Sequence, residues 1–540
     1  MTGASALANA CWLASGYSAN RRFCRALKTP GETQEAWLRA QLARHARSRY
    51  GEAHEFASIH DGTAFSRRVP LVDYETLAPW IERVGRGEPQ VLGTDAVTHL
   101  APTSGSTGAS RLIPFTRGLT AAFDAAVSPW MTDLARQRPR LVGGPVYWSV
   151  SPLGDTTRPA DADDLSQAVP VGFADDAEYL GGPKAWLVRQ LLAVPSSVRH
   201  VRDERDFWSL SLLALLRQRE LRLISVWHPT FLELLVAAAE GAWPDLLDAV
   251  ERGACPWAGA LPASARGAWR ARPDSARAAE LRRIGPSDWP RWWPHLQVVS
   301  CWGEQAAASG WRRIATHLAA RLPGVLVQAK GLLATEAIVT VPIGEARPLA
   351  ITSHYFEFLD ESGDIRRAHE LVRGKRYEVI VTNGGGLWRY RLGDIVECTG
   401  HLVATPSLRF LGRAGQVSDL RGEKLCEPFV AEALRLLWGV HAPPAVATLR
   451  GWEDGASAGY ELLLSTETLC EAVTEVARRM EGALRENPHY ALARRLGQLA
   501  PLRVVIVEPD AARGELRQRT GRLGDAKPRT LVGAHESARG

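Results

Sequence analysis

Short apolar segments alternate with longer helical ones across the middle of this 540-residue chain. The short segments are rich in Val, Leu, Ile and Trp, a composition typical of buried strands. The longer segments are rich in Leu and Ala, which favour helices. The predicted strands are 146–150, 223–228, 296–302 and 325–328, and the clearest predicted helices are 207–216, 231–239 and 306–321. This alternation predicts β-sheets covered by helices, an α/β fold.

The length of the chain predicts more than one domain, because a single compact core rarely holds so many residues. Two strand-rich stretches, 338–358 and 376–396, follow the alternating region. From about Gln416 the pattern changes to a helix, two strands, a long helix and a last strand, which indicates a separate small α+β domain. We therefore place a large N-terminal domain at 1–415 and a small C-terminal domain at 416–540.

Composition and charge argue against several classes of protein. The chain is 46% hydrophobic and 23% charged, as in ordinary globular proteins, and its net charge of +6 is small for its length. We therefore expect no nucleic-acid or membrane partner, and we interpret the arginine-rich run at 266–291 as solvated helix surface. The seven cysteines are scattered and form no CxxC pair, which favours a reducing cytoplasm over a disulfide framework or a zinc cluster. An apolar patch at 6–14 precedes the nearby basic residues, the reverse of a secretory signal.

The segment 103–116 combines two glycines with five hydroxyl side chains in its first eight positions. Glycines let successive backbone N–H groups converge on phosphate oxygens, and Ser or Thr hydroxyls add donors without bulk. The glycines are three residues apart and no Gly-Lys-Ser/Thr ending follows, so this is not a Walker loop. A phosphate-binding loop is the functional interpretation, and a plain surface turn is the alternative. The candidate phosphate-binding residues are Ser104, Gly105, Ser106, Thr107 and Gly108.

Two later motifs add groups that complement a phosphate loop. Thr335 and Glu336 place a hydroxyl beside a carboxylate. Thr335 could donate to an α-phosphate, and Glu336 could hold Mg²⁺, which at nucleotide sites takes one or two carboxylates plus phosphate oxygens. Asp394 ends a Tyr-Arg-x-Gly-Asp motif at a tight glycine turn, where it could accept hydrogen bonds from both ribose hydroxyls. A hairpin turn with an acidic corner is the alternative for Asp394.

Lysine usage directs attention to two further positions. Only six of the 65 basic residues are lysines. Lysine is a compact point charge, whereas the arginine guanidinium is a broad planar fork, so a tight site beside a reacting phosphate can require lysine. Lys424 belongs to a Gly-Glu-Lys turn near the expected domain junction, shortly after a Gly-Arg turn at Arg413, and Lys527 lies in the C-terminal domain. For Lys527 the alternative is a solvated tail residue.

In this order and approximate spacing, the segments resemble the acyl-adenylate-forming superfamily, which includes luciferases and acyl-CoA ligases. Within it the chain resembles the Gretchen Hagen family of acyl-acid amido synthetases, in its bacterial form. Family-like stretches run nearly end to end, and Tyr-Phe-Glu-Phe at 355–358 and Asn-Pro-His-Tyr at 487–490 separate the family from CoA ligases. The resemblance implies the adenylate-forming fold: helix-covered sheets with a small β-barrel-like subdomain, followed by a mobile C-terminal cap.

The resemblance also implies a two-step reaction. A small carboxylic acid is joined to the α-phosphate of ATP with loss of pyrophosphate, and the acyl group then passes to an amine, typically of an amino acid. ATP and Mg²⁺ are thus the implied cofactors, and we expect a cytoplasmic monomer.

The family's motif residues map onto positions already singled out. By motif match, Asp394 binds ribose, Phe410 and Arg413 lie along the nucleotide, and Lys424 reaches a phosphate or the acyl carboxylate. Lys527 approaches the reacting carboxylate and the α-phosphate, and residues 414–418 form the hinge of the cap.

Two positions depart from the superfamily pattern. Arg111 stands where a loop lysine is usual, and Gly415 stands where many relatives carry an acidic hinge residue. Two alternatives to the amide synthetase stay open, and the Arg111 departure motivates the second of them. One is a ligase that passes the acyl group to CoA or a carrier thiol, and the other is a binding protein that kept the fold and lost turnover.

Overall fold

The computed structural model describes most of the chain. The described residues are 2–103, 111–149, 169–172, 181–304, 307–413, 417–418, 420–421, 423, 425–438, 444, 446–454, 457–465, 473–495, 498–508 and 530–532. The candidate phosphate-loop residues 104–108, hinge residues 414–416, Lys424 and Lys527 lie outside these ranges.

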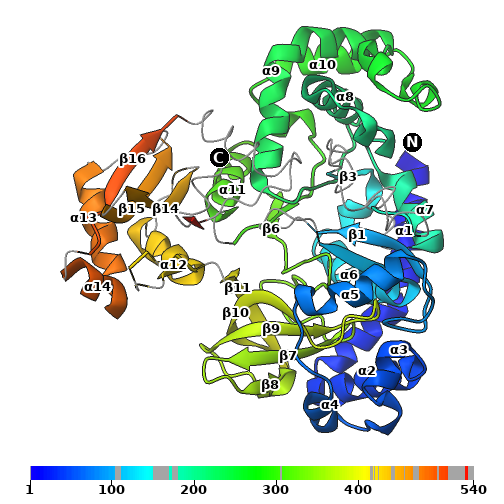
Figure 1. Cartoon of the computed structure of the whole chain (residues 1–540). Coiled ribbons are helices and arrows are strands. Elements are labelled where there is room, and N and C mark those ends of the chain that lie inside the picture. Colours follow the sequence, from blue (N-terminus) through cyan, green and yellow to red (C-terminus); the bar gives the residue numbers. More distant parts are fainter. Residues whose placement is uncertain are drawn as a thin grey trace.

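Helices make up the N-terminal part of the molecule (Figure 1). They are α1 (Thr2–Ala26), α2 (Pro30–His45), α3 (Arg49–Ala53), α4 (Gly62–Arg68) and α5 (Tyr74–Gly85). Helix α1 buries Ala8, Trp12, Ala19 and Phe23, which recur at helical spacing, and it packs along α6 (Arg117–Gln137) and α7 (Gly182–Leu191). Among the described residues, no helix has both the length and the hydrophobicity needed to span a bilayer.

The two sides of the candidate phosphate loop form an antiparallel pair of strands, β1 (Val97–Pro102) and β2 (Leu112–Thr116). Residues 112–116, which the sequence suggested as part of the loop, are instead a fully buried strand. Helix α6 begins directly after it, where the Thr116 side chain accepts a hydrogen bond from the Leu119 N–H as an N-cap. The candidate loop therefore joins two strands, and the N-terminus of α6 lies one strand further along the chain.

A four-stranded parallel sheet confirms the alternation predicted for the middle of the chain. Its order is β3-β4-β5-β6, and all neighbours are parallel. The strands are β3 (Val146–Trp148), β4 (Leu223–Ser225), β5 (Val298–Cys301) and β6 (Leu326–Ala329). The connecting segments contain α7, α8 (Glu204–Leu216), α9 (Pro229–Arg252), α10 (Ser275–Ile284) and α11 (Ala308–Arg321). Alternate strand residues pack into two hydrophobic cores, one on each face of the sheet.

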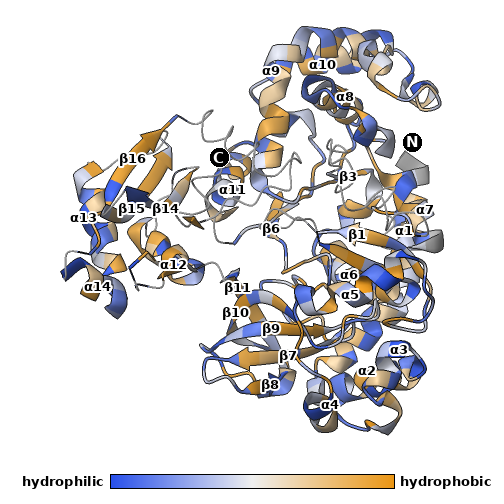
Figure 2. Ribbon diagram, in the orientation of Figure 1, coloured by the Kyte–Doolittle hydropathy of each residue, from blue (hydrophilic) through white to orange (hydrophobic). Residues whose placement is uncertain are grey.

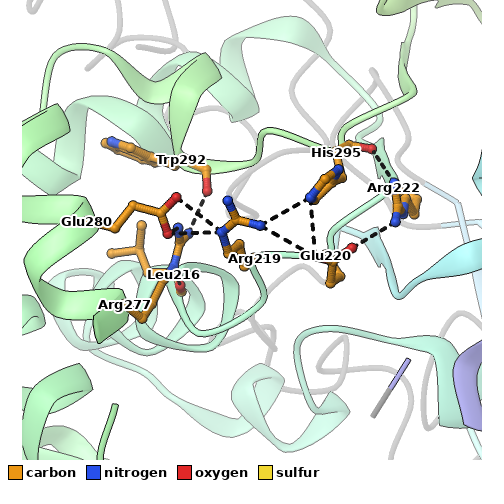
Figure 3. A network of polar contacts seen from close by, with 8 residues as sticks. All are labelled: Leu216, Arg219, Glu220, Arg222, Arg277, Glu280, Trp292 and His295. Atoms are coloured by element: carbon orange, nitrogen blue, oxygen red, sulfur yellow. Dashed lines mark hydrogen bonds and ion pairs between the residues drawn. The ribbon is translucent and has the colours of Figure 1, made fainter. Parts of the chain in front are cut away.

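The arginine-rich run at 266–291 is not simply a solvated helix surface, as the sequence suggested. Arg277 on α10 is 4% exposed and donates to the carbonyls of Leu216 and Trp292 and to the Glu280 carboxylate (Figure 3). Arg219 reaches the same carboxylate. The run therefore ties the end of α8 to α10 through buried charged hydrogen bonds.

A five-stranded antiparallel sheet follows, in the order β11-β10-β9-β7-β8, and corresponds to the expected small subdomain. Its strands are β7 (Tyr355–Asp360), β8 (Ile365–Arg367), β9 (Arg376–Thr382), β10 (Tyr390–Leu402) and β11 (Thr405–Arg413). Residues 338–353, expected to be strand-rich, form only isolated bridges. Pro342 and Pro348 lack the N–H that a continuous ladder requires.

The C-terminal part forms a sheet of order β16-β15-β14-β17 with its own hydrophobic cluster (Figure 1). Its elements are β12 (Val417–Ser418), β13 (Leu425–Cys426), α12 (Glu427–Trp438), β14 (Ala447–Asp454), β15 (Ser457–Ser465), α13 (Val473–Leu484), α14 (Pro488–Arg495), β16 (Arg503–Val507) and β17 (Leu531–Val532). Figure 2 shows hydrophobic residues concentrated in the strands of this sheet and both colours on its helices. The mixed α+β character is as expected, while the boundary between 415 and 416 stays a prediction.

Candidate nucleotide-binding site

Two of the predicted nucleotide residues face each other across β10 and β11. Asp394 and Arg413 are register partners, and the Asp394 Oδ1 atom lies 3.1 Å from the Arg413 Nε. Gly393 adopts φ +77°, a conformation that favours glycine, and the pairing of β10 with β9 shifts register at this point. The Asp394 side chain is 5% exposed, so its charge is held by a guanidinium rather than by water.

Thr335 and Glu336 occupy the centre of a tight turn. The Ala334 N–H donates to the Ala337 carbonyl at 2.9 Å, which closes the turn. The Asn383 Nδ2 donates to the Glu336 carbonyl at 2.7 Å and so ties the turn to the segment between β9 and β10. Glu336 is 5% exposed. The Thr335–Glu336 pair is thereby fixed beside the strands that carry Asp394 and Arg413.

The charges of this region act on one another. Burial raises the pKa of Glu336, and Asp394 adds to the rise, while the guanidinium groups of Arg413 and Arg111 oppose it. Asp394 and then Glu336 raise the pKa of Arg413. Two carboxylates and two guanidinium groups therefore share one partly desolvated region, and three of them were predicted as nucleotide-binding residues.

Arg111 belongs to this cluster, although the sequence marked it only as a departure from the superfamily. Its carbonyl accepts from the Thr103 N–H at 2.8 Å, so the two ends of the candidate phosphate loop meet at this residue. Its guanidinium lies over the ring of Tyr74, with 5.4 Å from Cζ to the ring centroid, and 3.2 Å from Glu75 Oε1. Burial raises the pKa of Tyr390, and Arg111 opposes the rise both by charge and by a side-chain hydrogen bond. The base of the loop thus lies on the same side of the molecule as Asp394 and Glu336.

Phe410 connects β11 to the end of β5. Its N–H donates to the Glu304 Oε2 at 3.0 Å, and its ring packs edge-on against Trp302 with centroids 5.6 Å apart. Burial raises the pKa of Glu304 to about 7, while the Arg347 guanidinium, 3.6 Å away, opposes the rise. A carboxylate that is 11% exposed and an aromatic pair therefore join the two sheets beside the charged cluster.

The structure brings Glu336, Asp394 and Arg413 together and places Phe410 on the same strand as Arg413. Tyr390 and Glu304 also belong to this region, although their sequence context did not identify them as site residues. Tyr390 begins the Tyr-Arg-x-Gly-Asp motif, and Glu304 lies just past a predicted buried strand, where α/β sheets commonly bind ligands.

The fold matches that of a solved structure, and family models match most of the chain. The solved structure of AtGH3.15 acyl acid amido synthetase in complex with 2,4-DB matches with a TM-score of 0.81 and 19% identity, covering 98% of this chain and 95% of that chain. The match confirms the expected fold, which the chain shares with that synthetase over nearly its whole length. The GH3 family N-terminal domain matches residues 19–321, and the GH3 family central domain matches residues 348–413. This chain belongs to the GH3 family, so the Gretchen Hagen resemblance is confirmed.

Two named relatives show how far the sequence similarity extends. The probable indole-3-acetic acid-amido synthetase GH3.12 of Oryza sativa subsp. japonica is 25% identical over 453 residues, covering 75% of this chain and 72% of the relative. The GH3 domain-containing protein of Homo sapiens is 28% identical over 282 residues, covering 47% of this chain and 52% of the relative.

Proposed function

We propose that this chain is an ATP-dependent acyl-acid amido synthetase that activates a small carboxylic acid and transfers the acyl group to the amine of an amino acid. The observation that carries the proposal is the cluster of Glu336, Asp394 and Arg413 beside Arg111 at the base of the Ser/Gly loop, in a chain of the GH3 family. Paired carboxylates and guanidinium groups suit a ligand that has both hydroxyl donors and phosphate acceptors.

In the first step, a carboxylate oxygen of the acid attacks the α-phosphorus of ATP, and the bond to the β-phosphate breaks to release pyrophosphate. In the second step, the amine nitrogen attacks the acyl carbon, AMP leaves with the bonding electrons, and the nitrogen loses a proton. Both steps concentrate negative charge at the α-phosphate. Fixed donors stabilise such charge, and removing one typically costs about a hundred- to a thousandfold in rate.

We assign roles to the residues by their chemistry. Asp394 accepts hydrogen bonds from the ribose hydroxyls, and Phe410 lies along the nucleotide. Arg111 and Arg413 supply guanidinium donors, which bind phosphate oxygens in pairs. Thr335 donates its hydroxyl to the α-phosphate.

The loop and the C-terminal lysines complete the proposed site. Ser104 to Gly108 supply backbone and hydroxyl donors to the phosphates. Lys424 and Lys527 approach the phosphate and the reacting carboxylate from a C-terminal cap at 416–540, with residues 414–418 as its hinge.

Glu336 fits a single-carboxylate magnesium site. Among the described residues, no group of three or more His, Cys, Asp or Glu side chains could hold a metal ion, so a site made by the protein alone is not present there. Magnesium bound with ATP takes one or two carboxylates and completes its shell with phosphate oxygens and water. We propose that Glu336 provides that carboxylate, and the ion would neutralise phosphate charge when bound.

The decisive experiment supplies ATP, a panel of small carboxylic acids, and either amino acids or CoA. An amide product with release of AMP and pyrophosphate supports the proposal. A CoA thioester without any amide would instead establish the thioester ligase, and ATP binding without acid-dependent pyrophosphate exchange would establish a non-catalytic relative.

A second experiment tests Lys527. We expect Lys527→Ala to lower pyrophosphate exchange about a hundred- to a thousandfold, the usual loss for one transition-state donor. Lys375→Ala, at an exposed turn before β9, is the matched control and should leave exchange unchanged. Unchanged exchange in Lys527→Ala would show that another group meets the carboxylate.

We also propose that the protein is a cytoplasmic monomer. Six cysteines in the described ranges are free thiols, which is consistent with a reducing compartment. Light scattering coupled to gel filtration tests the oligomeric state, and a mass of twice 59.0 kDa would contradict it.

A further inference from the structure

The side chain of Gln328, on β6, contains a buried hydrogen-bond donor that has no acceptor among the described residues. Its Oε1 accepts from the Trp130 Nε1 on α6 at 2.7 Å, which fixes the orientation of the amide because only the carbonyl oxygen can face an indole N–H. The Nε2 group is therefore a donor. Gln328 is 6% exposed, and its Nε2 has no hydrogen-bond partner among the described residues. A buried donor without a partner is costly, so this position calls for a ligand or an ordered water.

Ser300 adds a second polar group of the same kind on the neighbouring strand. Ser300 on β5 is the register partner of Gln328 on β6, and register partners point to the same face of a sheet. Ser300 is 1% exposed, and within the described part of the chain its Oγ also has no hydrogen-bond partner. The two residues thus form a short polar row on the face of the sheet that α6 covers, as the bond from Trp130 to Gln328 shows.

Lys330 brings a positive charge to the same face. Its N–H donates to the Cys301 carbonyl at 2.9 Å, so the ladder continues past β6, and alternation turns Lys330 and Gln328 to one side. Lys330 is 6% exposed, and its Nζ lies 4.7 Å from the centroid of the Trp227 ring. Trp227 follows β4 and is 38% exposed. These residues lie at the carboxyl ends of parallel strands, the edge where open α/β sheets bind ligands.

The same edge borders the proposed nucleotide site. The Trp302 N–H donates to the Trp227 carbonyl at 2.8 Å. Trp302, just past β5, is thus paired with Trp227, just past β4, whose ring lies beside Lys330. The Trp302 ring packs against Phe410, one of the predicted nucleotide residues. Ser300, Gln328 and Lys330 are therefore linked, through Trp227 and Trp302, to the strand that carries Phe410.

We propose that Ser300, Gln328 and Lys330 form a subsite for a carboxylate group of a substrate, separate from the carboxylate that is adenylated. Ser300 and Gln328 each keep a buried polar atom without a described partner, and Lys330 places an ammonium group on the same face, so an anionic group with several acceptor positions suits this face of the sheet. The inference rests on the proposed function. The carboxylate has two sources: the second carboxylate of a dicarboxylic acid, or the α-carboxylate of the acceptor amino acid.

The first test needs no substitution. Pyrophosphate exchange is measured with hexanoate and with adipate, which differ only in a terminal carboxylate. If the acid supplies the group, adipate should exceed hexanoate in kcat/KM by about ten- to a hundredfold, the range for hydrogen bonds to a charged partner. If the amino acid supplies it, the two acids should be used alike.

The second test removes the charge with Lys330→Met, and Lys375→Met on an exposed turn is the matched control. If the acid supplies the carboxylate, the adipate preference should disappear in Lys330→Met, while exchange with hexanoate stays unchanged. If the amino acid supplies the carboxylate, its KM should rise by about ten- to a hundredfold in Lys330→Met, while pyrophosphate exchange stays unchanged. Gln328→Glu should act in the same way, because it keeps an acceptor for Trp130 but replaces the Nε2 donor with a carboxylate oxygen that repels an anionic group.

The outcomes separate this inference from the proposed function. Absence of exchange with every acid in the unsubstituted protein refutes the function. The subsite is then judged by calorimetric titration with adipate, hexanoate and an amino acid. If neither the adipate preference nor amino-acid binding changes in Lys330→Met and Gln328→Glu, the subsite is refuted, and water fills the polar row.

Discussion

Asp394 and Arg413 face each other from paired strands, with the carboxylate Oδ1 3.1 Å from the guanidinium Nε. One carboxylate oxygen is thus engaged by arginine, and the buried charge is held in place for a second partner. We expect Asp394→Asn to raise the KM for ATP in pyrophosphate exchange by about ten- to a hundredfold, because neutral acceptors bind hydroxyl donors more weakly than charged ones. The fold should survive, since asparagine keeps the size and one acceptor oxygen.

The same pair of strands provides the control. Glu397 and Arg409 are also register partners on β10 and β11, 2.7 Å apart, but this pair is more exposed. Glu397→Gln should change the KM for ATP little, because an exposed ion pair contributes at most about 1 kcal/mol. An equal effect of both substitutions would mean that Asp394 acts only by supporting the hairpin.

How far the sequence predicts this site depends on the range of each contact. Asp394 and Glu336 were identifiable because short motifs place them at tight turns. Their proximity was not, since it depends on Asn383, which bridges to the Glu336 carbonyl across 47 positions of the chain. The role of Arg111 was hidden for the same reason: it follows from the pairing of β1 with β2 around the loop.

The helices and strands likewise divide into those predicted from local sequence pattern and those that depend on long-range packing. The parallel strands were predicted because each is a continuous apolar run between helices. Helix α1 was not predicted, because its buried residues are separated by small and polar ones and only the packing against α6 shows which face is buried.

The raised pKa of Glu304 predicts that the free energy of unfolding depends on pH. Burial raises the pKa of its carboxyl from 4.5 to about 7, so the folded state binds the proton more tightly than the unfolded state does. The stability that this group contributes is therefore fully present below about pH 4.5 and is lost as the pH rises through about 7. Glutamine carries no charge at either pH and so avoids this loss. We therefore expect the free energy of unfolding of Glu304→Gln, relative to the unsubstituted protein, to be higher at pH 8 than at pH 5 by on the order of 3 kcal/mol, since one pKa unit corresponds to about 1.4 kcal/mol.

The measurement compares urea unfolding of both proteins at the two pH values. Other groups titrate in this window as well, so the quantity of interest is the difference between the variant and the unsubstituted protein. A difference that is the same at pH 5 and pH 8 would mean that Glu304 is already ionised at pH 5.

A buried ion pair anchors the strand that carries Asp394. Arg389 donates to Glu357 at 2.8 Å, and the two side chains are 4% and 1% exposed. Arg389 also donates to the carbonyls of Ser66 and Val69. We expect Glu357→Gln to lower the free energy of unfolding by about 3–5 kcal/mol, because it leaves a buried guanidinium without its counter-charge.

Glu378 offers the comparison, because its partner Arg391 is 45% exposed. Glu378→Gln should cost at most about 1 kcal/mol. Denaturant unfolding followed by tryptophan fluorescence measures both costs. Equal costs would show that water reaches Arg389 when its partner is removed.

Glu423 organises the turn that precedes Lys424. Its carboxylate is fully buried and accepts from the N–H groups of Leu420 and Arg421 at 2.8 and 2.7 Å. It also accepts from the Tyr460 hydroxyl on β15. The turn is therefore fastened to the C-terminal sheet by one side chain.

Glu423→Gln replaces one of the acceptor oxygens with an amide that donates, so at least one of these three bonds must be lost. If the turn presents Lys424 to the substrate, pyrophosphate exchange should fall about tenfold or more, because small misplacements of a catalytic group are costly. Glu453→Gln, which removes only the partly exposed contact with the Arg421 guanidinium, is the control and should leave exchange near its original rate. Loss of exchange in Glu423→Gln with an unchanged melting temperature would assign the effect to position, whereas unchanged exchange would show that the turn does not present a group needed for adenylation.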